Sequence, residues 1–269
     1  MNLFFRKYGS GPAFVILHGL YGSSDNWVGI ANSLKDNFEV FIPDLRNHGQ
    51  SPKSDLMNYT ELRNDVVDFF AQNNIEKAIV LGHSMGGRIA IDFALNYPEK
   101  ISHLVVADIS PRPYSESRNY KLIFKHHRFI LQQLLSVNLP DFNERKQISD
   151  LLQKKLYDER LVNFLLKNLK RDKESGFYWA INLDVINNEL ENILKGASGT
   201  ELANFLNTSG FPVLFLKGSL SSYLTSDDYV FIRKLFPFAE IEEIEDAGHW
   251  LHAEQPEIFV NKVREFVFS

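Results

Sequence analysis

The stretch Gly82-His83-Ser84-Met85-Gly86 decides the fold class of this chain. It has the pattern G-x-S-x-G, it follows the apolar run 78–81, and it opens the helical pattern 85–97, which Pro98 ends. A serine in a sharp turn between strand and helix is a nucleophile elbow, because glycines let the backbone turn tightly and the helix N-terminus favours negative charge. The pattern therefore predicts that Ser84 is a nucleophile at the edge of a sheet.

Short apolar runs recur on both sides of this turn, at residues 14–17, 38–42, 104–107 and 213–216. Runs of this kind are typical of strands that are buried on both faces of a parallel sheet. Helical patterns lie between several of them, such as residues 59–70 with Thr60 as a candidate N-cap. The alternation predicts an α/β fold with a mostly parallel central sheet flanked by helices, and with ligands bound at the carboxyl ends of the strands.

The pattern changes between about residue 112 and residue 210, where strand-like runs disappear and helical segments rich in Leu and Phe, such as 120–135 and 161–169, take their place. In the second segment, four apolar residues fall on one face at helical spacing, which favours a lid packed on the core over a helix on a membrane surface. They are Leu161, Phe164, Leu165 and Leu169. We expect a core of residues 1–111 and 211–269 and a helical cap, 112–210, inserted after the strand that ends at Asp108.

Composition and charge exclude several classes of function. The formal net charge is -5, from 29 basic and 34 acidic side chains, and no run of Lys or Arg stands out, so nucleic acid is not an expected partner. The absence of cysteine excludes disulfides, a thiolate nucleophile and Cys-ligated zinc. No apolar run is long enough to span a bilayer, and the first residues lack the apolar segment of a signal peptide. We therefore expect a cytoplasmic protein that does not insert into membranes.

A loop histidine near the end of the chain is the candidate base. A serine hydroxyl is hardly ionised at neutral pH, so Ser84 needs a group that accepts its proton. His249 follows Gly248 in a loop after the alternating strand 241–245 and before a helix that begins near Pro256. A histidine in that position can reach the carboxyl edge of the sheet. We expect His249 to be the general base.

Other histidines are interpreted differently. His252 is close to the candidate base in sequence, and His126 and His127 lie in the predicted cap, but none follows a glycine that would free the backbone. We expect these three to be structural or solvated. His18 comes directly after the first long strand, and we expect its side chain to make structural hydrogen bonds.

The loop His18-Gly19-Leu20-Tyr21-Gly22 supplies a candidate donor for an oxyanion. The backbone N–H of Leu20 can face the same oxygen as the N–H of Met85, the residue after the nucleophile. The base also needs a carboxylate that holds its tautomer and stabilises the imidazolium ion. Asp108 is the best placed, because it ends the strand that follows the nucleophile's helix.

Six motifs, in order along nearly the whole chain, resemble the YbfF-type esterases of the alpha/beta-hydrolase superfamily. They are HGLYGSSDNW (18–27), PDLRNHGQS (43–51), MNY (57–59), GHSMGG (82–87), ADISP (107–111) and AGHWLHAEQP (247–256). The resemblance implies hydrolysis of short to medium acyl esters and acyl-CoA thioesters beneath a helical cap, without metal or cofactor. Within the helical insert the resemblance is thin.

The position of the acid has a rival. Many hydrolases of this fold place it after a later strand, but residues 217–223, which follow that strand here, contain no carboxylate. Asp227 and Asp228 come further along and follow Ser226, so we expect them in the first turn of a helix, where they complement its dipole. Asp108 is therefore preferred.

Two other features bear on the chemistry. Dehalogenases and epoxide hydrolases of this fold carry Asp at the elbow, where this chain has Ser84, which favours chemistry through an acyl-enzyme. Asp44 and the segment Arg46-Asn47-His48-Gly49 follow another strand. They either line the pocket or brace the loop, and bracing is preferred.

The sequence thus predicts a serine hydrolase that cleaves small-molecule carboxylic esters or thioesters. Two alternatives stay open. One is a C–C bond hydrolase that acts on a ring-cleavage product with the same triad, and the other is a small-molecule-binding protein of this fold without turnover. Nothing in the sequence specifies an oligomeric state.

Overall fold

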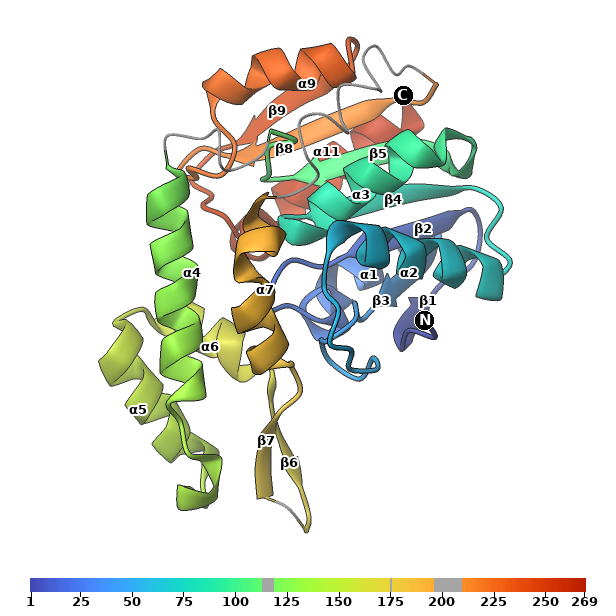
Figure 1. Cartoon of the computed structure of the whole chain (residues 1–269). Coiled ribbons are helices and arrows are strands. Elements are labelled where there is room, and N and C mark those ends of the chain that lie inside the picture. The colour runs from blue at the N-terminus through green and yellow to red at the C-terminus, as the bar shows by residue number, and fades with distance from the viewer. Residues whose placement is uncertain (113–118, 175, 196–209) are drawn as a thin grey trace.

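A computed structural model of the chain describes residues 1–112, 119–174, 176–195 and 210–269 (Figure 1). A seven-stranded sheet has the strand order β1-β3-β2-β4-β5-β8-β9. β1 pairs antiparallel with β3, and the other neighbouring pairs of this sheet are parallel. The strands are β1 (Phe5–Tyr8), β2 (Ala13–Leu17), β3 (Glu39–Pro43), β4 (Ala78–His83), β5 (Ile101–Ala107), β8 (Val213–Gly218) and β9 (Glu240–Ile244).

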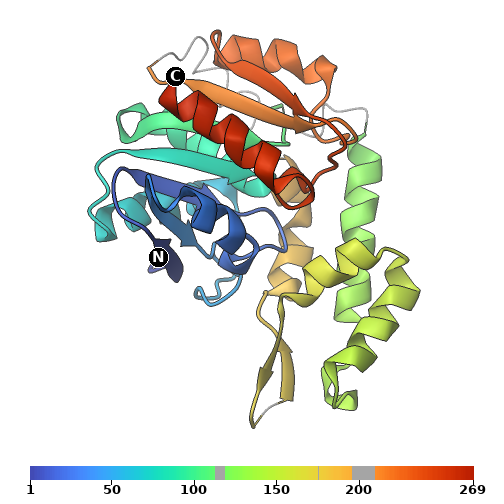
Figure 2. The ribbon, with the colours of Figure 1, turned by 180° about the vertical axis from the view of Figure 1, so that it is seen from behind.

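Helices cover both faces of this sheet. Figure 1 shows α2 (Tyr59–Gln72), α3 (Met85–Asn96) and α9 (Tyr229–Leu235) over one face, and Figure 2 shows α1 (Val28–Leu34) and α11 (Pro256–Phe268) over the other. Fully buried residues of β2 alternate between the two layers, Val15 and Leu17 toward the first and Phe14 and Ile16 toward the second. This period of two is what a strand between two helical layers requires. The predicted α/β fold with a mostly parallel sheet is confirmed.

The described part of the predicted cap lies beside the carboxyl edge of the sheet (Figures 1 and 2). Its elements are α4 (Tyr120–Leu135), α5 (Arg145–Leu156), α6 (Glu159–Leu166), β6 (Leu169–Asp172), β7 (Gly176–Trp179) and α7 (Leu183–Lys195). Residues 113–118, 175 and 196–209 lie outside the described residues. The division into core and cap stays a prediction, and "cap" below means residues 119–195.

The prediction that strands disappear from this region is wrong, because β6 and β7 form an antiparallel hairpin. The helix predicted at 161–169 ends at Leu166, and Leu169 begins β6. Leu169 is nevertheless buried. The apolar residues that resemble one helical face therefore belong to two elements, α6 and β6, which bury their side chains in the same core.

Two smaller details also differ from expectation. The N-cap of α2 is Asn58 rather than Thr60, because the Asn58 side chain accepts a hydrogen bond from the backbone N–H of Glu61 at 3.0 Å. Strand β1 was not predicted, since an edge strand that is only partly buried has no continuous apolar run. Among the residues that the structure describes, no helix is both long enough and apolar enough to cross a membrane.

Candidate active site

Ser84 lies in the predicted turn, between the end of β4 and the first residue of α3. Its backbone has φ 53° and ψ -120°, a strained conformation for a residue with a side chain. A Cβ atom at Gly86 would lie 2.2 Å from the carbonyl oxygen of Leu17, and one at Gly82 would lie 2.3 Å from the carbonyl oxygen of Gly86. Close backbone approach therefore requires both glycines, and the turn places Ser84 at the carboxyl edge of the sheet.

The structure brings Ser84, His249 and Asp108 into one line of contacts. His249 Nε2 lies 3.1 Å from Ser84 Oγ, and His249 Nδ1 lies 2.7 Å from Asp108 Oδ2. Asp108 is fully buried directly after β5, where its Oδ1 accepts a hydrogen bond from the backbone N–H of Gly218 at 3.2 Å. The carboxylate is thus oriented by the neighbouring strand β8, and it faces the ring nitrogen remote from the serine.

The loop after β8 contributes two side chains that sequence reasoning missed. The Ser221 hydroxyl donates a hydrogen bond to Asp108 Oδ2, the same oxygen that contacts His249. The Tyr223 ring stacks on the His249 ring, with centroids 3.7 Å apart and planes at 16°. Residues 217–223 contain no carboxylate, and contacts of a hydroxyl or an aromatic ring with the candidate acid and base were not predicted. A signal was nevertheless present in the sequence. Ser221 carries a hydroxyl and follows β8, and β8 pairs with β5, the strand after which Asp108 lies.

Tyr223 also connects this loop to the cap. Its hydroxyl lies 3.2 Å from Nε2 of His127, which belongs to α4. Burial raises the pKa of Tyr223 well above its usual value, and burial lowers the pKa of His127 to about 3. The tyrosine therefore keeps its proton and the histidine stays neutral, so the hydroxyl can donate to the imidazole. His127 also lines the cavity beside Ser84. The sequence predicted only a structural or solvated histidine at this position.

The other candidate histidines have separate roles. Buried His18 accepts a hydrogen bond at Nε2 from the backbone N–H of Leu45 at 2.9 Å, as expected of a structural side chain. His252 is buried and stacks on Trp27, with ring centroids 4.0 Å apart. His83, which the sequence did not single out, lies with Nε2 2.8 Å from the carbonyl oxygen of His249 and so braces the loop of the base.

Leu20 and Met85, the predicted sources of oxyanion donors, both line a small cavity at Ser84. Met85 is the first residue of α3, so its N–H has no partner within the helix. Among the described residues, no hydrogen bond uses the backbone N–H of Leu20 or of Met85. Within the described residues, both donors therefore lack a partner next to Ser84.

A cavity of about 200 Å³ opens beside Ser84 and is walled by both core and cap. The cap contributes apolar side chains to it, among them Ile130, Leu161 and Phe164. A larger cavity of about 570 Å³ shares Phe164 and Trp250 with it. The rings of these two residues, with centroids 5.2 Å apart, stand between the two spaces.

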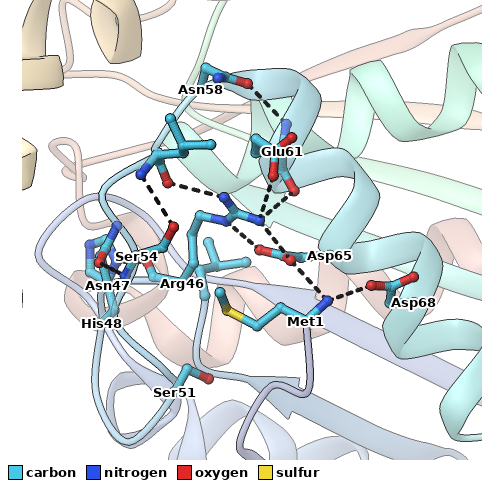
Figure 3. A network of polar contacts seen from close by, with 12 residues as sticks. Met1, Arg46, Asn47, His48, Ser51, Ser54, Asn58, Glu61, Asp65 and Asp68 are labelled. Atoms are coloured by element: carbon cyan, nitrogen blue, oxygen red, sulfur yellow. Dashed lines mark hydrogen bonds and ion pairs between the residues drawn. The ribbon is translucent and has the colours of Figure 1, made fainter.

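Arg46 braces the loop that follows β3 (Figure 3). Its guanidinium is 4% exposed and bonds both oxygens of the buried Asp65 on α2, with Nε 2.6 Å from Oδ2 and Nη2 2.9 Å from Oδ1. Nη1 also donates to the carbonyl oxygen of Leu56 at 3.0 Å. Arg46, Asn47 and His48 are absent from the walls of the two cavities at Ser84, as far as the described residues form them. The bracing role is the one that these contacts support.

The carboxylates after the later strand lie away from the base. Ser226–Asp228 forms a 3-10 turn that precedes α9, and buried Asp228 accepts hydrogen bonds from Thr225 N at 2.8 Å and Thr225 Oγ1 at 2.9 Å. It also forms an ion pair with Arg112 at 2.7 Å. These contacts are those of a helix cap, and neither Asp227 nor Asp228 lines the cavities at Ser84.

Comparison with known proteins agrees with this geometry. The profile of a family described as alpha/beta hydrolase fold matches residues 12–256, which is most of the chain. The chain belongs to the alpha/beta-hydrolase family. This alpha/beta-hydrolase is 38% identical to the sn-1-specific diacylglycerol lipase ABHD11 of Danio rerio over 98% of its own length and 80% of the relative's. It is 31% identical to Esterase YbfF of Escherichia coli, over 94% of its own length and 92% of the relative's.

A solved structure described as a marine microorganism esterase is 43% identical to this alpha/beta-hydrolase and superposes with a TM-score of 0.91, covering 98% of this chain and 99% of that one. These three proteins are a lipase and two esterases, and together with the family match they show that the chain is a hydrolase of the esterase and lipase type.

Proposed function

We propose that this alpha/beta-hydrolase cleaves carboxylic esters and thioesters through an acyl-enzyme on Ser84. The observation that carries the proposal is the line of contacts Ser84 Oγ to His249 Nε2, 3.1 Å, and His249 Nδ1 to Asp108 Oδ2, 2.7 Å. A nucleophile, a base and an acid at these separations have the geometry of a serine-hydrolase triad.

The proposed reaction has two halves. His249 Nε2 accepts the proton of Ser84 as Oγ attacks the acyl carbon, and the carbonyl oxygen becomes an oxyanion. Collapse of this intermediate breaks the bond to the leaving alcohol or thiol, which takes the proton from His249. Water then attacks the acyl-enzyme with the same base, and the acid product leaves with Ser84 restored. Asp108 holds the tautomer with the proton on Nδ1 and stabilises the imidazolium ion, without itself being protonated.

In this scheme the backbone N–H groups of Leu20 and Met85 donate hydrogen bonds to the oxyanion. Donors fixed by the backbone need no rearrangement as charge develops, and for that reason they stabilise the transition state more than the ground state. The stacked ring of Tyr223 places an aromatic face against the imidazole that becomes a cation. Both contacts favour the charge distribution of the tetrahedral intermediate.

The cavities support the proposed substrates. The apolar cap side chains Ile130, Leu161 and Phe164 suit an acyl chain of a few methylenes, which places medium chains ahead of acetyl. Each buried methylene adds up to about 0.8 kcal/mol of binding free energy. The larger cavity is lined by the cations Arg160 and Lys167 and by the carboxylates Asp246 and Glu254, so its charge does not decide between an alcohol and a coenzyme A leaving group. Ester substrates also agree with the names of the relatives from Danio rerio and Escherichia coli.

The first experiment tests the nucleophile. A fluorophosphonate should label Ser84, identified by mass spectrometry of peptides, and Ser84→Ala should abolish labelling and lower kcat by several powers of ten, because the acyl-enzyme needs the hydroxyl. Heat-denatured protein is the control for non-specific reaction. Labelling of another residue, or a Ser84→Ala variant with near-normal turnover, would refute the mechanism.

The second experiment tests the substrate class. The kcat/KM values for p-nitrophenyl esters and for acyl-CoA thioesters of graded length should rise from acetyl to medium chains in both series. Turnover of esters alone would remove thioesters from the proposal. A C–C bond substrate that is cleaved faster than any ester would favour the alternative hydrolase, and binding without turnover in every series would favour a receptor.

A further inference from the structure

The loop predicted to supply the Leu20 amide contains a strained residue. Tyr21 has φ 62°, in the left-handed region that glycine occupies more readily. It is the third residue of a turn closed by a hydrogen bond from Gly22 N to Gly19 O at 2.9 Å. A turn with positive φ at its third residue usually has glycine or asparagine there. Tyrosine at this position means that surrounding structure must hold the turn in place.

This turn determines the direction of the Leu20 N–H. That N–H belongs to the peptide unit whose oxygen is the carbonyl of Gly19, and a trans peptide is planar with N–H and C=O pointing in opposite directions. The Gly19 oxygen is fixed by Gly22 N, and His18 Nδ1 lies 2.9 Å from it as well. The N–H of Leu20 therefore points away from these partners only as long as the turn stays closed.

A buried side chain of the cap holds Tyr21 in this conformation. Asn168 is 3% exposed, and its Nδ2 donates to the carbonyl oxygen of Tyr21 at 2.7 Å. No other hydrogen bond among the described residues reaches that oxygen. The cap fixes Asn168 in turn, since its side chain and its backbone N–H both donate to Leu165 O, and its own carbonyl oxygen accepts from Ala180 N at 2.8 Å.

We propose that Asn168 is a positioning residue for the oxyanion site: the cap, through the bond of this amide to the Tyr21 carbonyl, keeps Tyr21 left-handed and so aims the Leu20 N–H at the substrate oxygen. The proposal rests on the proposed function, because it assigns the Leu20 amide to the oxyanion. It makes the cap a part of the catalytic apparatus as well as a wall of the substrate cavity.

The chain provides a matched control for this contact. Asn182, also in the cap, donates from Nδ2 to Asn47 Oδ1 at 3.1 Å and from its backbone N–H to Asn47 O at 2.8 Å. Asn47 is likewise left-handed, with φ 66°. Neither residue lines the cavities at Ser84 in the described part of the chain. If the Asn168 amide only held cap and core together, its substitution should have the same effects on stability and turnover as substitution of Asn182.

The test compares Asn168→Ala and Asn182→Ala in two backgrounds, the natural chain and Tyr21→Gly. In the natural chain Asn168→Ala should lower kcat and the rate constant of fluorophosphonate labelling about tenfold, the value of one well-placed hydrogen bond, with little change in KM. In the Tyr21→Gly background the same substitution should cost less than about threefold, because glycine needs no help to stay left-handed. Asn182→Ala should lower Tm and leave kcat unchanged in both backgrounds.

The outcomes separate the two proposals. If wild-type protein is not labelled at Ser84, the proposed function fails. If Ser84 is labelled but Asn168→Ala keeps the wild-type labelling rate, or loses the same factor in both backgrounds, the positioning role of Asn168 is overturned and the function stands. Should Asn168→Ala not fold, Asn168→Leu, which keeps the volume and removes the donor, is measured in the same two backgrounds.

Discussion

Buried histidines should make the folded protein sensitive to acid at a pH where its carboxylates are still ionised. His18, His48 and His252 are at most 5% exposed. Burial lowers the pKa of His18 to about 4 and the pKa values of His48 and His252 to about 3. In the unfolded chain these side chains take up protons near pH 6.5. Below that pH the unfolded state binds protons that the folded state does not, so stability falls as the pH decreases from about 6.5 toward about 4.

The size of the effect follows from these pKa values. Between about pH 6.5 and about pH 5.5, each of the three side chains lowers the free energy of unfolding by about 1 kcal/mol, so together they remove about 3 kcal/mol. The total free energy of unfolding of a protein of this kind is about 5–15 kcal/mol. We therefore expect a large decrease in the urea midpoint over this one pH unit.

Urea unfolding followed by tryptophan fluorescence at about pH 7.5, 6.5 and 5.5 measures this dependence. His252→Gln removes one of the three groups and should reduce the loss of unfolding free energy between pH 6.5 and 5.5 by about 1 kcal/mol. His126→Gln is the comparison, because His126 is more exposed and burial lowers its pKa less than that of His252, so the slope should change less. An unfolding free energy that stays flat from pH 7.5 to 5.5 would refute the argument, as would an unaltered slope in His252→Gln.

Three further predictions concern the site and its bracing. Asp108→Asn should keep the fold and lower kcat by about 10³ to 10⁴, because the imidazole loses its orienting partner, whereas Asp227→Asn should leave steady-state kinetics unchanged; the reverse result would move the acid to the later loop. Ser221→Ala removes one donor to the Asp108 carboxylate and should lower kcat about tenfold at constant KM, so equal kcat in variant and wild type would show that the hydroxyl does not position the acid. Arg46→Met leaves the buried Asp65 without its bidentate partner and should lower the free energy of unfolding in urea by about 3 kcal/mol. The kcat/KM of the folded variant should equal that of the wild type. A loss of activity without loss of stability would place Arg46 in the site instead.

The parts of the site that were predictable from sequence are those encoded locally. The elbow at Ser84 needs glycines at fixed offsets, and His249 needs a free loop after a strand, so each leaves a pattern in a few consecutive residues. Asp108 could be named as the candidate acid because strand order could be inferred from the βαβ alternation. The same reasoning gave the parallel sheet and its two helical layers.

Other parts depend on contacts between distant segments, which no local pattern records. Ser221 and Tyr223 act on the base only because β8 lies next to β5, and Asn168 meets Tyr21 across a separation of 147 residues. The hairpin of β6 and β7 was missed for another reason. Its strands are only four residues long. β6 has the sequence LKRD, with three charged residues, and β7 has the sequence GFYW, which is too short to show a clear alternation.

The arrangement of Asp108 and Ser221 has a consequence for the history of such enzymes. These residues follow two adjacent strands, and the Ser221 hydroxyl meets the carboxylate oxygen that contacts His249. A carboxylate at either position would therefore face the same imidazole nitrogen. A lineage could acquire the second acid while it still held the first, and lose the first afterwards, without an inactive ancestor in between. Which of the two strands carries the acid would then depend on ancestry, because the chemistry is the same from either strand.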